Sequence, residues 1–182
     1  MKRGIPLLIL LWAGMAASAY AQSEFQLFVG GYNPGSQLSG TNFDNGALLG
    51  FRLGHSIARL FGTEFSYTYV KNLQDKGRNF DGRAHLLNGN FQVQLPVGRA
   101  VPFATVGMGN IIGETQNILK LKSSFAWNAG GGLKLRRLAG PVGARFDVRY
   151  YKVPDGVEIL GINTRKVDFD FAEVSGGLLI TF

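Results

Sequence analysis

The sequence predicts an all-β fold, an eight-stranded antiparallel up-and-down transmembrane β-barrel. Eight segments alternate apolar and polar side chains with a period of two, as strands with two different faces do. The connections between these segments are alternately long and short, which is typical of strands that cross a barrier and return. After residue 21 the sequence has no run of the roughly 20 apolar residues that a membrane-spanning helix needs.

The N-terminal segment, residues 1–21, has the layout of a secretory signal peptide. Two basic residues precede an apolar run from Ile5 to Trp12, and small residues lead to a cleavage site at Ala21. We therefore expect a cleaved signal peptide and a single mature barrel domain at residues 22–182. A retained anchor is the alternative, although the apolar run is short for a bilayer.

The composition argues against several classes of function. The formal net charge of +7 falls to +5 when the two basic residues of the signal peptide are removed, and the remaining basic residues are scattered. Nucleic-acid binding usually needs a basic stripe on one face, so we expect no nucleic-acid partner. The chain has no cysteine, so an exported domain must be stable without disulfides.

The first four expected strands each separate an apolar face from a polar one. The third is a clear example, because aromatic residues alternate with Gly, Glu, Ser and Thr. The four segments follow, with one example residue from the apolar face and one from the polar face in parentheses: 24–32 (Leu27 and Gln26), 47–55 (Leu53 and Arg52), 61–69 (Phe65 and Glu64) and 85–95 (Val93 and Gln92).

The last four expected strands follow the same rule, and the seventh shows the clearest alternation in the sequence. The fifth is the weakest, because glycines interrupt its pattern. These segments are 102–109 (Val106 and Thr105), 125–136 (Leu133 and Lys134), 141–151 (Phe146 and Asp147) and 172–182 (Leu178 and Thr181).

The connections fall into two sets that we expect at opposite ends of the barrel. Outer-membrane barrels have long extracellular loops and short periplasmic turns. The long connections are 33–46, 71–82, 110–122 and 154–166, and the short ones are 55–59, 96–100 and 136–140.

The polar face is expected to line the inside of the barrel. It is rich in Gly, Asn, Ser and Gln and carries charges of both signs, which suits a narrow lumen where each charge needs a partner. Aromatic residues near the strand ends of the apolar face are typical of the membrane interfaces. A soluble lipocalin-like barrel or sandwich, with the faces reversed, is the alternative. The charges expected in the lumen are Arg52, Glu64, Lys134, Arg145, Asp147, Arg149 and Glu173.

The last segment, AEVSGGLLITF, carries a family resemblance. Gly176 or Gly177, with Leu178, Ile180 and Phe182, resembles the C-terminal signal that the barrel-assembly machinery recognises. The whole mature chain resembles the small eight-stranded bacterial outer-membrane β-barrels, which include the transmembrane domain of outer-membrane protein A. The resemblance implies a bacterial outer-membrane location, with outer-membrane lipid, lipopolysaccharide and the assembly machinery as partners.

We expect a monomeric, non-enzymatic barrel with a structural, envelope-integrity or adhesion role through its loops. A filled lumen is favoured over a conduction path, and any pore would be narrow. The sequence predicts no catalytic residue, cofactor or metal site, since its two histidines, His55 and His85, lie on different strands without ligand spacing. A lipid A-modifying enzyme and a soluble ligand-binding barrel are the alternatives. Basic residues of the long connections could bind lipopolysaccharide phosphates or serve only solubility.

Overall fold

The computed structural model describes residues 22–35, 45–57, 59–75, 80–115, 119–121, 124–159 and 165–182. The predicted signal peptide lies outside the described residues. Within the described ranges, no helix is both long enough and apolar enough to span a membrane.

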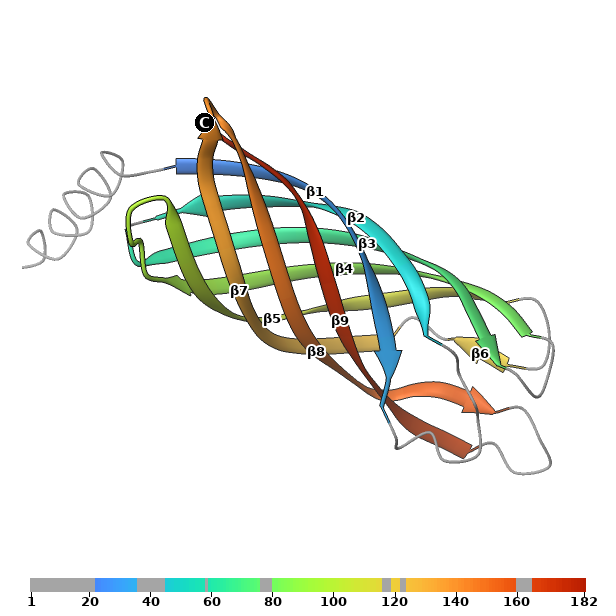
Figure 1. Ribbon diagram of the computed structural model, residues 1–182. Helices are drawn as coiled ribbons and strands as arrows, with labels where there is room; N and C mark the ends of the chain where they lie inside the picture. Colours follow the sequence, from blue (N-terminus) through green and yellow to red (C-terminus); the bar gives the residue numbers. More distant parts are fainter. Residues whose placement is uncertain are drawn as a thin grey trace, which may run out of the picture.

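Eight antiparallel strands form one closed barrel, and a ninth, very short strand lies outside the closure (Figure 1). Each barrel strand pairs with its neighbour along the chain, and β1 pairs with β9 to close the sheet. The predicted fold is therefore confirmed. The strands are β1 (Gln22–Pro34), β2 (Gly46–Ser56), β3 (Phe61–Asp75), β4 (Phe80–Gln94), β5 (Ala100–Thr115), β6 (Leu119–Leu121), β7 (Ser124–Ala139), β8 (Val142–Ile159) and β9 (Arg165–Thr181).

The closing ladder between β1 and β9 runs from Glu24 opposite Thr181 to Pro34 opposite Phe171. Beyond it, the backbone N–H of Ser23 donates to the carbonyl of Phe182 at 2.9 Å, and the reverse bond measures 3.0 Å. The last strand is thus paired up to its final residue. Closure leaves no open sheet edge toward lipid, where each unsatisfied backbone group would cost several kcal/mol.

The two ends of the barrel differ as the connections predict. Short turns join β2 to β3, β4 to β5 and β7 to β8 at the end where Figure 1 marks the C-terminus, which we call the turn end. Gly98 and Gly140 adopt φ angles of 62° and 59° in two of these turns, a left-handed conformation that glycine adopts readily. The opposite end, which carries the long connections, is called the loop end.

At the loop end the strands are longer than the sequence pattern predicts. Residues 71–82 were expected to be a loop, yet β3 continues to Asp75 and β4 begins at Phe80, and β8 and β9 likewise extend into 154–166. Ladder hydrogen bonds persist here although the alternation fades, because beyond the membrane both faces of a hairpin can meet water. β6 adds to this region by pairing with the outer end of β8.

The outer face of the barrel, and the inner face of its turn half, have the polarity that the alternation predicts. Large apolar side chains point outward, and Leu178 on β9 and Phe146 on β8 are 63% and 55% exposed. Arg52, Arg145 and Arg149 point inward and are each 1% exposed. Such an arrangement is suited to lipid outside and a filled polar interior, and it is the reverse of a soluble barrel.

Candidate functional site: the barrel lumen

An ionic cluster fills the middle of the lumen, centred on two carboxylates from different strands. Arg145 Nη1 lies 2.6 Å from Glu64 Oε2, and Arg145 Nη2 lies 2.8 Å from Asp147 Oδ1. Arg149 Nη2 reaches both carboxylates as well, at 2.8 Å from Glu64 and 2.9 Å from Asp147. β8 supplies three of these four residues because alternate positions of one strand face the same side.

Arg52 extends this cluster across the barrel toward β9. Its Nη2 lies 2.5 Å from Glu173 Oε1, and its Nη1 lies 3.2 Å from Asp147 Oδ2. The same guanidinium donates to Gln26 Oε1 at 3.0 Å and to Ser175 Oγ at 3.1 Å. Three arginines and three carboxylates are therefore linked in one network, in which each buried charge has an opposite partner.

A second ionic group lies nearer the turn end and includes two residues that the sequence argument did not assign to the network. Glu24 accepts from Lys134 Nζ at 2.6 Å and from Arg136 Nε at 2.6 Å. Lys134 also donates to Gln92 Oε1 at 3.0 Å. Glu24 and Arg136 share the inward parity of their strands, and that parity is the signal that could have identified them.

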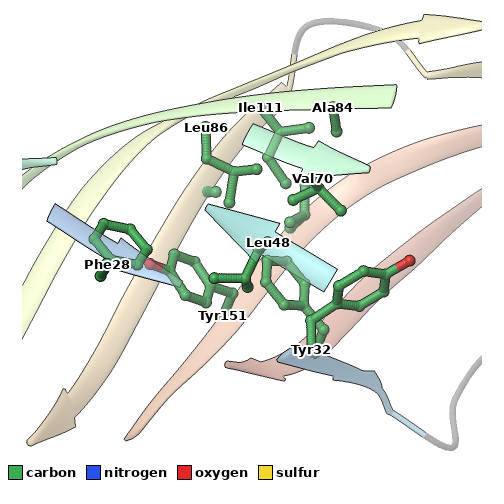
Figure 2. Close-up of a cluster of buried hydrophobic side chains, with 11 residues drawn as sticks. Phe28, Tyr32, Leu48, Val70, Ala84, Leu86, Ile111 and Tyr151 are labelled. Carbon is green, nitrogen blue, oxygen red and sulfur yellow. The ribbon is translucent and has the colours of Figure 1, made fainter. Parts of the chain in front are cut away.

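The loop half of the lumen is apolar, which the sequence argument did not expect. Figure 2 shows apolar side chains from most of the surrounding strands converging there. The rings of Tyr151 and Phe171 stack with centroids 4.6 Å apart, and Tyr32 meets Phe171 edge-on at 6.3 Å. This apolar plug consists of Phe28, Tyr32, Leu48, Val70, Ala84, Leu86, Ile111, Ala126, Tyr151, Val153 and Phe171.

The expectation of a polar inner face is thus right for the turn half and wrong for the loop half. The physical reason is that close packing, and not polarity, is what a narrow closed interior requires. A cation–π contact joins the halves, because the Arg52 guanidinium lies 3.7 Å from the centroid of Phe28 in the plug. A second contact, of Arg145 with Phe103 at 4.5 Å, lies within the turn half. The middle of the lumen is therefore filled by ionic packing and its loop half by apolar packing.

Glycines on the inner face of β7 make room for the bulky groups. A Cβ at Gly130 would collide with the backbone and side chain of Arg149, and a Cβ at Gly132 would press on the Phe103 ring. The absence of a side chain at these glycines therefore allows close packing against β8 and Phe103.

The two histidines lie on the outer face and are far from the ionic cluster in the strand pattern. His55 Nδ1 is 3.2 Å from Ser23 Oγ on β1, whereas its chain neighbour Ser56 points inward and accepts from Gln94. His85 Nδ1 is 2.8 Å from the hydroxyl of Tyr67.

A Ser–His pair needs an orienting carboxylate to work as a catalytic triad. The side-chain carboxylate next to Ser23 in sequence, that of Glu24, faces the lumen and binds Lys134 and Arg136. The described residues also contain no group of three or more His, Cys, Asp or Glu side chains that could hold a metal ion.

The C-terminal residues predicted to form the assembly signal lie on the outward face of β9. Leu178, Ile180 and Phe182 are exposed, with Phe182 at 73%, and Gly176 lies under the ring of Phe146. Recognition by the assembly machinery stays a prediction.

Of the basic residues of the long connections, the side chain of Lys71 is described and exposed, while Lys76, Arg78 and Lys122 lie outside the described residues.

A family model for the outer membrane protein beta-barrel domain matches residues 7–178. The chain belongs to this family of bacterial outer-membrane β-barrels. The family places the protein in the bacterial outer membrane, and the turn end is periplasmic because outer-membrane barrels have short periplasmic turns.

Solved structures agree with the fold. The barrel is similar to Neisserial surface protein A (TM-score 0.62, 14% identity, 89% of this chain and 97% of that chain). It is also similar to OprG from Pseudomonas aeruginosa (TM-score 0.63, 16% identity, 90% and 96%) and to the outer membrane protein AlkL (TM-score 0.56, 17% identity, 89% and 89%). At these identities the likeness concerns the fold alone. Comparison with curated proteins gave no match.

Proposed function

We propose that this protein is a non-enzymatic, closed barrel that holds surface loops in the outer membrane and contributes to envelope integrity or adhesion. The observation that carries the proposal is the filled lumen. The side chains of Arg52, Arg145 and Arg149 are at most 1% exposed and are held by ion pairs of 2.5 to 3.2 Å. The apolar plug closes the loop half above them.

Conduction needs a continuous path that water or ions can follow through the barrel. Each arginine in the ionic cluster would have to leave two carboxylates to open such a path, which leaves uncompensated buried charge. The apolar plug would also have to admit ions while offering them only the hydroxyl groups of Tyr32 and Tyr151. The interior of an eight-stranded barrel is just wide enough for its own side chains, so the packing supports a structural role.

The loop end supports the surface-exposed part of the proposal. β6 and the outer ends of β8 and β9 form a three-stranded sheet beyond the barrel closure. In this outer sheet Leu119 pairs with Ile159, and Ile159 pairs with Arg165. Three paired strands hold their shape better than a single hairpin. This outer sheet would present a partner with a fixed surface. The partners we propose are lipopolysaccharide or an extracellular ligand at this end, with the barrel-assembly machinery acting during insertion of a monomer.

Planar-bilayer recording tests the closed lumen. The refolded barrel is expected to give no conductance steps, with a porin reconstituted in the same way as the positive control. Reproducible steps from the wild-type barrel would contradict the proposal. Lipid A mass spectra from cells with and without the protein should be identical, and a shifted mass that depends on His55 would favour the enzyme alternative.

Removal of the outer sheet tests the adhesion part separately. Val157 and Val167 are paired residues, so replacing residues 158–166 by Asn-Gly would join them through a two-residue hairpin turn. We expect this variant to fold and insert normally but to lose surface attachment. Attachment at the wild-type level would exclude the outer sheet as the binding surface.

A further inference from the structure

The turn end of the barrel opens into a basic mouth that none of the interactions described above accounts for. The three connections at the turn end, taken with the last four residues of β7 as residues 57–60, 95–99 and 136–141, contain four arginines and no Asp or Glu. They bring Arg59, Arg99, Arg136 and Arg137 around one cavity of about 820 Å³. Its volume is within the range of small-molecule sites.

The mouth adjoins the lumen on one side and reaches the outward-facing Phe182 on the other. Ser56 and Gln94 line it, and both are buried residues of the inward face. A ligand in this cavity would therefore enter from the periplasm. The backbone N–H of Arg136 donates to the carbonyl of Arg99 at 2.8 Å, which fixes two of the turns against each other.

Two of the four arginines of the mouth, Arg99 and Arg137, are not balanced by described carboxylates in the way that the lumen charges are. Glu24 binds Arg136 and Lys134, so that carboxylate is already shared between two cations. Among the ion pairs of the described residues, none involves Arg99 or Arg137, and no Asp or Glu side chain lines the described cavity.

Arg137 adopts a backbone conformation that residues with a side chain rarely take. Its φ is 54°, in a stretch where the β7–β8 register shifts between Leu135 and Ala139. A residue other than glycine in this region is uncommon, and such positions cluster at functional sites. The turn holds an arginine where a glycine would be the easier choice.

We propose that this mouth binds a polyanion that carries phosphate groups. Guanidinium groups bind phosphate oxygens in a bidentate fork, and several forks around one cavity favour a ligand with more than one phosphate over a single carboxylate. A soluble periplasmic phosphate ester fits this position at the periplasmic end. The headgroup of an acidic phospholipid in the inner leaflet has the same chemistry and is the second source that the experiment must separate.

The test uses the barrel refolded in phosphatidylcholine nanodiscs, with tripolyphosphate as the probe in calorimetric titrations at low and high NaCl. Arg99→Gln combined with Arg137→Gly removes two guanidinium groups, and glycine keeps the left-handed turn at residue 137. We expect binding by the wild type that weakens with salt, and a loss of affinity of about tenfold or more in the double variant.

Two further variants serve as controls. Arg83→Gln with Lys152→Gln removes the same charge from the loop end and should leave tripolyphosphate affinity unchanged. Arg99→Lys with Arg137→Lys keeps the positive charge but removes the bidentate guanidinium groups. This variant should lose most of the affinity for tripolyphosphate. Heat-modifiable migration on gels shows that each variant is folded.

A second set of nanodiscs containing phosphatidylglycerol separates the two sources. If this lipid prevents the binding of tripolyphosphate to the wild type, the ligand is a lipid headgroup and the proposal of a phosphate-binding site is supported. If it does not, the soluble ester is supported. Equal affinity in the wild type and the Arg99/Arg137 glutamine–glycine variant, full affinity in the lysine variant, or no binding of tripolyphosphate without competing lipid would each overturn the proposal.

Discussion

The turn half and the loop half of the lumen are equally buried but are held together by different physical means. In the turn half, guanidinium groups and carboxylates pair at 2.6 to 2.9 Å around Glu64 and Asp147. In the loop half, rings and aliphatic side chains fill the space. An ionic network depends on every member, whereas an apolar cluster depends mainly on filled volume. The same barrel wall therefore encloses one strongly coupled region and one more tolerant region.

Removal of the Asp147 carboxylate should have the largest effect on stability. Asp147→Asn removes the one carboxylate that Arg52, Arg145 and Arg149 all contact, so that Glu64 and Glu173 alone remain to balance three buried guanidinium groups. Breaking a buried ion pair from one side costs about 3–5 kcal/mol, so we expect a loss of that order in the free energy of unfolding. Urea unfolding in lipid vesicles measures it. A loss below about 1 kcal/mol would show that water screens the ionic cluster.

A cavity in the apolar plug should cost somewhat less. Leu86 is 1% exposed inside the barrel, and its neighbour Leu87 is 37% exposed on the outside, so the two make a matched pair. We expect Leu86→Ala to cost about 2–4 kcal/mol because it leaves a cavity. Leu87→Ala should cost clearly less, because lipid can fill the space it leaves. Equal losses in the same urea titration would mean that the plug is not close-packed.

The Lys134–Glu24 pair should show a coupling that an apolar pair lacks. Lys134→Met leaves Glu24 with Arg136 as its cation, and Glu24→Leu leaves Lys134 without its carboxylate. The double variant removes both charges of the pair, so it should be more stable than the summed single effects predict. Coupling between contacting residues is about 0.5–3 kcal/mol. The matching cycle of Val70→Ala and Ala84→Gly, cross-strand neighbours in the plug, should come closer to additivity. Additive effects at Lys134 and Glu24 would remove the distinction between the halves.

The outer-surface pair of Ser23 and His55 provides the baseline for both halves. Its hydrogen bond of 3.2 Å is exposed, so Ser23→Ala and His55→Gln should each change the free energy of unfolding by no more than about 0.5 kcal/mol. Thermal shift assays in detergent are sufficient to check this. A large loss, or a change in lipid A composition, would give this pair a role that its geometry does not suggest.

The sequence pattern predicts the strands and their faces well because a period of two is a direct consequence of strand geometry. Arg52 and Glu64 could be assigned to the lumen from parity alone. Parity with Arg52 and Asp147 also places Leu48 and Tyr151 inside, but it does not predict that the loop half of the inner face is apolar, because Leu49 and Tyr150 make the outer face apolar at the same level. Parity also says nothing of partners across the barrel.

Partners across the lumen depend on the shear of the closed sheet, which no local pattern contains. Arg52 meets Asp147, which is 95 residues away in the chain, and Lys134 meets Glu24 at a separation of 110 residues. The contact between Ser23 and His55 is also not predicted, because it depends on the β1–β2 register, which the alternation does not define. The basic mouth was missed although its arginines lie in the predicted short turns, because the turns come together only in the closed barrel.

The ladder between β1 and β9 has a kinetic consequence. Phe25 cannot find Ile180 until almost the entire chain has been synthesised, so the barrel has a high contact order and closes late. Before that moment β1 and β9 are open edges that other chains could pair with. The period between export and closure is therefore when this protein is most exposed to aggregation, and a chaperone would matter most during that interval.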